Sequence, residues 1–102
     1  MNKSITVHEL YFVYQKKDIV ILDVRKTNEY IKKHLSHSIS IPITSLSAQL
    51  NNLDTKKQYY IVGAANHLAQ EVTSYLIENG LQATYVVDNM KLFENRELTS
   101  PL

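Results

Sequence analysis

Cysteine is missing from all 102 residues of the sequence. Its absence excludes disulfide bonds, thiolate metal sites and a cysteine nucleophile within this chain. Long hydrophobic runs are missing too, since none approaches the roughly 18 to 20 apolar residues that a membrane-spanning helix needs. The first residues also lead into no apolar stretch of the kind found in signal peptides. We therefore expect a soluble, cytoplasmic protein with no membrane partner.

The sequence also lacks a marked excess of either charge. It has 11 Lys and Arg residues against 10 Asp and Glu, a net charge of +1, and its basic residues adjoin one another only in pairs. Such pairs usually belong to a solvated surface, so we expect no nucleic-acid partner. His8, His34 and His37 show no metal-ligand spacing and have no cysteine or paired carboxylate nearby. We therefore expect no metal site and no cofactor.

What remains is the composition of an ordinary globular domain, with 44% hydrophobic and 21% charged residues. A chain of this length can form one hydrophobic core but not two. Uninterrupted apolar runs of strand length alternate with segments of helical period, which predicts an α/β fold with a mainly parallel sheet between two helix layers. We expect one domain over residues 1–102, with an ordered part over about 4–93 and a poorly ordered tail over 94–102.

The expected elements are read from periodicity and from residues that begin or end helices. Thr6 and Glu9 form a capping-box pattern, Thr27 is expected to cap a second helix, and Gly80 suits a left-handed helix end. Helices are expected over residues 7–15, 28–34 and 90–93, from residue 44 or 45 to residue 53, and from residue 68 to the cap at Gly80. Strands are expected over residues 19–22, 38–41, 59–62 and 83–87.

The stretch from residue 58 to residue 80 carries the candidate site. It reads as a buried strand, a short turn and an amphipathic helix, and α/β sheets usually present their sites at the carboxyl end of such a strand. His67 is the only titratable side chain in the turn. It could bind a ligand or act as an acid or base, but a solvent-facing histidine in the first helical turn is the simpler interpretation.

Several short motifs, taken in order along the chain, match those of a known family. They are Ile21-Leu22-Asp23-Val24-Arg25, then Glu29-Tyr30, His34-Leu35 and Ile41-Pro42, then the stretch over residues 59–76, and finally Val87-Asp88-Asn89-Met90. In this order and spacing they resemble the rhodanese-like (sulfurtransferase) domains. The resemblance extends over about residues 4–93 and implies a three-layer domain with a central, mainly parallel sheet flanked by helices.

The resemblance fails at the residues that carry the family's chemistry. Active members usually have Cys-x-x-Gly-x-Arg-Ser in the loop after the central strand. The implied register places Gly63 at the cysteine, Asn66 at the glycine, Leu68 at the arginine and Ala69 at the serine. The resemblance thus implies that no catalytic residue is left and that the following residues form a vestigial active-site loop: Gly63, Ala64, Ala65, Asn66, His67 and Leu68.

Two further residues have a role that only the resemblance implies. Asp23 and Arg25 follow a strand and are expected to support the neighbouring loop rather than to take part in catalysis. Leu68 is expected to have joined the core, because it continues a helical stripe with Val72 and Leu76.

These substitutions predict a function without sulfur transfer, because a persulfide forms on a thiolate and this chain has none. We expect a catalytically inactive rhodanese-like domain that serves as a binding or regulatory module related to sulfur handling. Its partner would be an unidentified protein or a small anion held weakly by the loop amides. The alternative is an enzyme with altered chemistry that uses His67 or a partner's cysteine.

Overall fold

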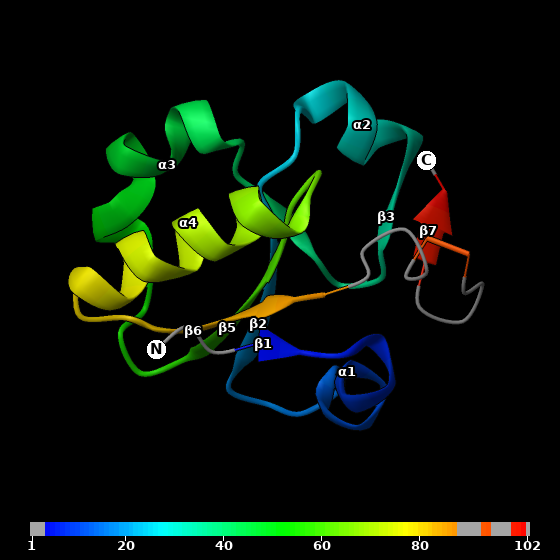
Figure 1. Ribbon diagram of the computed structural model, residues 1–102, viewed down its shortest axis with the longest axis horizontal. Coiled ribbons are helices and arrows are strands. Elements are labelled where there is room, and N and C mark those ends of the chain that lie inside the picture. Colours follow the sequence, from blue (N-terminus) through cyan, green and yellow to red (C-terminus); the bar gives the residue numbers. More distant parts are fainter. Residues whose placement is uncertain (1–3, 88–92, 95–98, 102) are drawn as a thin grey trace.

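The computed structural model describes residues 4–87, 93–94 and 99–101, and its centre is a five-stranded parallel sheet. The strands lie in the order β1-β6-β5-β2-β4, and every neighbouring pair is parallel. Their bounds are β1 Ser4–Ile5, β2 Ile19–Asp23, β4 Ile39–Ser40, β5 Gln58–Val62 and β6 Gln82–Val86. Figure 1 shows helices on both sides of this sheet. The expected α/β fold is therefore confirmed.

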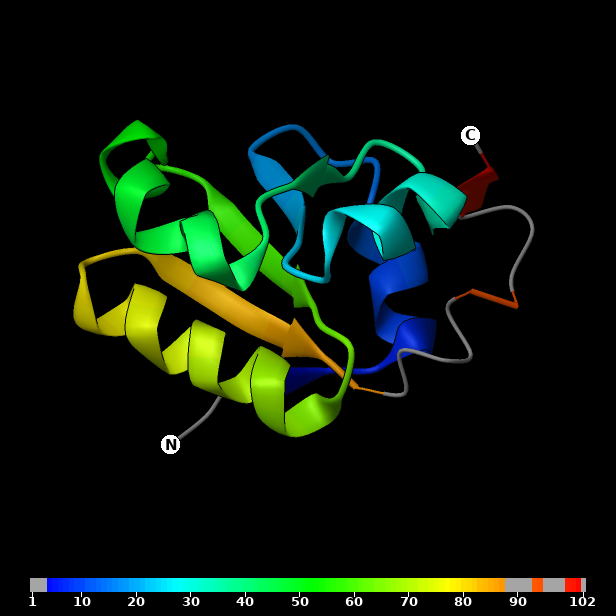
Figure 2. The ribbon, with the colours of Figure 1, turned by 90° about the horizontal axis from the view of Figure 1, so that it is seen from above.

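Four α-helices surround the sheet within the described residues. They are α1 Val7–Val13, α2 Thr27–Lys32, α3 Ile43–Gln49, which a short 3₁₀ helix Leu50–Asn52 extends, and α4 Asn66–Glu78. In Figure 1, α3 and α4 lie on one side of the sheet and α1 on the other, and Figure 2 shows α3 beside α4. None of the described helices combines the length and apolar character needed to cross a membrane.

The central strand β5 has an uninterrupted apolar sequence because both faces of the sheet are covered. Tyr59 and Ile61 point into a core that also contains Val72 and Leu76 of α4. Val62 belongs to a second core on the side of α1, together with Leu10. The alternation of side chains along β5 therefore supplies both layers of the domain.

The ends of α1 and α4 follow from local sequence. The expected capping box is confirmed, because the Glu9 backbone N–H donates to Thr6 Oγ1 at 3.1 Å and the Thr6 N–H donates to Glu9 Oε1 at 3.0 Å. Gly80 has φ = 84° and ends α4 as expected. The Leu81 N–H donates to the Leu76 carbonyl and the Gly80 N–H to the Ile77 carbonyl, which is the Schellman pattern.

The capping box leads to a stability prediction. Thr6→Ala removes the side-chain acceptor and is expected to lower the free energy of unfolding by about 1 kcal/mol, whereas Thr6→Ser should change it little. The hydrogen bond from the Thr6 backbone lowers the pKa of Glu9. The contribution of Glu9 is thus present above the ordinary carboxyl pKa and is lost as the pH falls through the lowered value. Urea unfolding of the three proteins at pH 7 and pH 3 tests this, and an unchanged Thr6→Ala midpoint would contradict it.

Two expectations for the segment after β2 were wrong. Thr27 is the first residue of α2 rather than its cap, and the helix ends at Lys32 instead of residue 34. Residues Lys33–Leu35 form strand β3, which pairs antiparallel with β7, Thr99–Pro101. Those last three residues were expected to be poorly ordered. A pairing between segments more than 60 residues apart leaves no periodic signal in either one.

The remaining boundaries differ by a few residues. Helix α1 ends at Val13 instead of residue 15, α3 begins at Ile43 instead of residue 44 or 45, and α4 begins at Asn66 instead of residue 68. The expected short helix over residues 90–93 lies mostly outside the described residues. So does most of the expected tail, and the single-domain boundary stays a prediction.

Candidate functional site

The site predicted from the sequence lies where strands β2 and β5 end. These strands are neighbours in register, with Asp23 opposite Val62. The Val24 N–H donates to the Val62 carbonyl at 2.9 Å, so the chain leaving β2 stays beside the chain leaving β5. The turn that contains Arg25 and the loop that begins at Gly63 are therefore brought to one edge of the sheet.

The loop itself is shorter than expected. Only Gly63–Ala65 connect β5 to α4, because the helix begins at Asn66. Asn66, His67 and Leu68 thus form the first turn of α4. The six residues that the sequence grouped as a loop are half loop and half helix.

Gly63 is buried and lies close to α4. A Cβ atom at this position would stand 3.1 Å from the Ala69 nitrogen and 3.2 Å from Ala69 Cβ, both tighter than ordinary van der Waals contact. Glycine therefore permits the loop to pack directly against the start of the helix. A side chain here requires the helix to move by a few tenths of an ångström.

The backbone amides of the loop and first turn are partly used within the helix. The Leu68 and Ala69 N–H groups both donate to the Ala65 carbonyl, each at 3.1 Å. Ala65 stands at the N-cap position and has no side chain that could accept from the helix. Among the described residues, no carbonyl or side chain accepts from the N–H groups of Asn66 and His67. Anion binding at this turn stays a prediction.

Leu68 has not joined the core, contrary to the expectation. The face of α4 that packs on the sheet consists of Ala69, Val72, Thr73 and Leu76, and Leu68 is half-buried beside it. Successive residues of a helix point about 100° apart. Because Ala69 faces the sheet, the neighbouring Leu68 is turned toward the surface.

At the surface Leu68 lines two adjoining hollows. The smaller, of about 190 Å³, lies over the ends of the strands. The larger, of about 310 Å³, lies between α3 and α4. The two share Leu68 and Ile43. The smaller is lined by Val24, Arg25, Lys26, Glu29, Pro42, Ile43, Thr44, Ala64 and Leu68, and the larger by Ile43, Leu46, Ser47, Leu68, Glu71, Val72 and Tyr75.

The sequence did not predict these hollows. The feature of the sequence that could have indicated them is the series of small residues after Ile43, which only Leu46 interrupts. Small side chains in this segment leave space beside α4. That signal is weak, because the depth of a groove depends on how two helices pack.

Asp23 and Arg25 form the strongest polar contact near the loop. Arg25 Nη2 lies 2.8 Å from Asp23 Oδ2, and Arg25 Nε lies 3.1 Å from both carboxylate oxygens. The side chains are 10% and 1% exposed. Arg25 Nη2 also donates to the Lys33 carbonyl at 2.6 Å, and its guanidinium carbon lies 4.1 Å from the centroid of the Phe93 ring.

These contacts tie the end of β2 to β3 and to Phe93. The described hydrogen bonds of the Arg25 side chain run to β2 and β3, and none reaches the Gly63 loop. Support of the loop by Asp23 and Arg25 therefore stays a prediction. The pair does border the loop, because Arg25 and Ala64 line the same hollow.

His67 is exposed on the first turn of α4. It borders a shallow, polar surface on α4 that also includes Gln70, Glu71 and Glu78. No described hydrogen bond or ion pair orients its ring. Within the described ranges, no three His, Asp or Glu side chains come close enough to hold a metal ion, and the absence of a metal site stays a prediction.

The parallel sheet, its order and the loop between β5 and α4 define a rhodanese-type α/β domain. A family model described as a rhodanese-like domain matches residues 6–89. The chain therefore belongs to the rhodanese-like domain family. It is a member without cysteine.

Related proteins agree with this assignment. The chain is 27% identical over 85 residues to the thiosulfate sulfurtransferase GlpE of Coxiella burnetii, covering 83% of this chain and 79% of that protein. The GlpE of Pseudoalteromonas translucida is 26% identical over 86 residues, covering 84% and 82%.

Solved structures agree with it as well. A rhodanese-like domain protein from Staphylococcus aureus is 31% identical, with a TM-score of 0.84 over 94% of this chain and 95% of that one. SSP1007 from Staphylococcus saprophyticus is also 31% identical, with a TM-score of 0.83 over 94% and 97%.

Proposed function

We propose that this protein is a catalytically inactive rhodanese-like domain that serves as a binding or regulatory module related to sulfur handling. The observation that carries the proposal is the buried Gly63 at the position implied for the nucleophile, in a chain without cysteine. Sulfur transfer from thiosulfate requires a thiolate that attacks the outer sulfur and releases sulfite. No other side chain of this chain can hold transferable sulfur as a persulfide.

The surroundings of the loop favour binding over chemistry. Leu68 stands at the position implied for the arginine, and it borders an apolar hollow instead of presenting charge. An apolar concavity that a domain retains at its surface is a common place for a ligand or a partner. A protein partner thus fits this surface better than a small anion does. A cytoplasmic location stays a prediction from the sequence.

The alternative is an enzyme with altered chemistry that uses His67 or a partner's cysteine. A catalytic histidine is usually oriented by a hydrogen bond to its second nitrogen. His67 is exposed and receives no such bond from the described residues. This arrangement favours the binding module.

The proposal predicts that the purified protein forms no thiocyanate from thiosulfate and cyanide above the buffer rate. The reason is the missing nucleophile, and cysteine-type phosphatase activity should be absent for the same reason. A cysteine-containing thiosulfate sulfurtransferase, assayed in parallel, is the positive control. Turnover that survives repurification and is lost in His67→Ala would overturn the proposal in favour of altered chemistry.

A further inference from the structure

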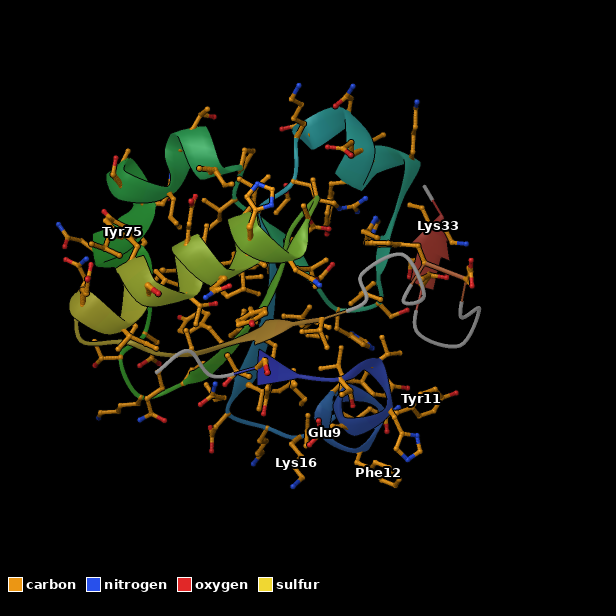
Figure 3. The ribbon with its side chains drawn as sticks, in the orientation of Figure 1. Glu9, Tyr11, Phe12, Lys16, Lys33 and Tyr75 are labelled. Atoms are coloured by element: carbon orange, nitrogen blue, oxygen red, sulfur yellow. The ribbon has the colours of Figure 1, made fainter. Side chains whose placement is uncertain are left out.

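The larger hollow beside the vestigial loop is a groove between α3 and α4, and its walls are mainly apolar. Leu46 and Val72 lie along its bottom, each 4% exposed. Ile43 is 42% exposed on the α3 side, and Leu68 and Tyr75 are half-buried on the α4 side. Figure 3 shows Tyr75 at the C-terminal half of α4. The volume of about 310 Å³ matches one or two large side chains rather than a whole helix.

The two helices that form the groove carry only negative charge. Neither α3 nor α4 contains a lysine or arginine, and the only charged residues of the two are Glu71 and Glu78. The whole chain, by contrast, has a net charge of +1. Glu71 lines the groove itself, and both carboxylates border the adjoining polar surface of α4.

Neither glutamate is neutralised by the described part of the chain. The ion pair found there joins Arg25 to Asp23, and no Lys, Arg or His nitrogen of the described residues pairs with Glu71 or Glu78. Glu71 and Glu78 lie about one and three helical turns along α4 from His67, and with it they border the polar surface of that helix. An apolar groove with an unpaired acidic rim is complementary to an apolar side chain that has a cation next to it.

We propose that this groove binds a segment of a partner protein that inserts an apolar side chain between α3 and α4 and places lysine or arginine side chains against Glu71 and Glu78. This inference rests on the proposed function, because it names the partner of the non-catalytic module. Thiosulfate and other small anions do not fit this groove, since its charged groups are acidic.

The test uses the ¹⁵N-labelled protein and three short, capped peptides. The first has a Leu-Phe pair between two lysines, the second has glutamates in place of the lysines, and the third has alanines in place of Leu-Phe. We expect the first peptide to shift the amide signals of residues that line the groove, such as Leu46, Leu68 and Tyr75. The second and third should bind at least about threefold more weakly, and rising salt should weaken the two lysine peptides but not the glutamate peptide.

Two pairs of variants locate the binding. Ser47→Trp fills the groove from its exposed rim and should abolish the shifts, whereas Ala48→Trp adds the same bulk at the next exposed position, outside the groove. Glu71→Gln should weaken the lysine peptide by roughly two- to fivefold. Asp18→Asn removes an exposed carboxylate elsewhere and should have no effect.

Several outcomes would overturn the inference. They are equal binding of the lysine and glutamate peptides, binding that Ser47→Trp leaves intact, and the absence of groove shifts at millimolar peptide. Concentration-dependent dimerisation that shifts the same signals would show instead that a second copy fills the groove. None of these outcomes bears on the thiosulfate assay, so the proposed function fails only if turnover is found.

Discussion

Asp23→Ala is expected to lower the free energy of unfolding by about 3 to 5 kcal/mol, because it leaves the buried guanidinium of Arg25 without its carboxylate. Asp23 accepts from the Arg25 side chain through both oxygens and from the Arg25 backbone N–H at 3.0 Å. The domain's total stability is of order 5 to 15 kcal/mol, so the loss is a large share of it. Urea unfolding followed by tyrosine fluorescence measures the change.

Two further variants keep this prediction testable if Asp23→Ala does not fold. Arg25→Lys retains a cation but loses the paired geometry and the contact with Phe93, so an intermediate loss is expected. Replacing both partners, as Asp23→Leu with Arg25→Met, should cost less than Asp23→Ala because no charge is left unpaired. A loss below about 1 kcal/mol in Asp23→Ala would contradict the importance of the pair.

Gly63→Cys is expected to create a reactive thiol without restoring sulfur transfer. The cysteine would stand at the N-terminal end of α4, where the helix dipole and the amides favour the thiolate and thus alkylation. Thiosulfate would still meet Leu68 and Ala69 at the positions implied for arginine and serine, so the leaving sulfite would lack stabilisation. Adding Leu68→Arg should therefore raise thiosulfate turnover above that of the single variant.

The structure adds a stability term to this prediction. The new Cβ would crowd Ala69 at 3.1 to 3.3 Å, so Gly63→Cys and its control Gly63→Ala should both unfold at lower urea than the parent. Leu68→Arg should cost less than a core substitution, because Leu68 is only half-buried. Alkylation rates, thiosulfate turnover and unfolding midpoints are compared across all variants. If the single variant turns over as fast as the double one, the missing arginine is not what limits the chemistry.

Much of the fold and of the functional interpretation was determined by the sequence alone. The apolar run of β5, the capping box at Thr6 and the glycine at the end of α4 are local features, and each acts on residues within one or two turns of itself. The sequence alone also establishes the loss of the nucleophile, because no tertiary arrangement supplies a thiol to a chain without cysteine.

The tertiary structure decided what depends on packing between distant segments. Leu68 and Ala69 differ by one helical step, and only the docking of α4 on the sheet selects Ala69 as the inward residue. The pairing of β3 with β7 joins segments whose sequences have no period of their own. The groove between α3 and α4 has Leu46 and Val72, two residues of the same core, at its bottom. The pattern of side chains predicts which face of each helix is buried, but it does not determine how closely two helices approach.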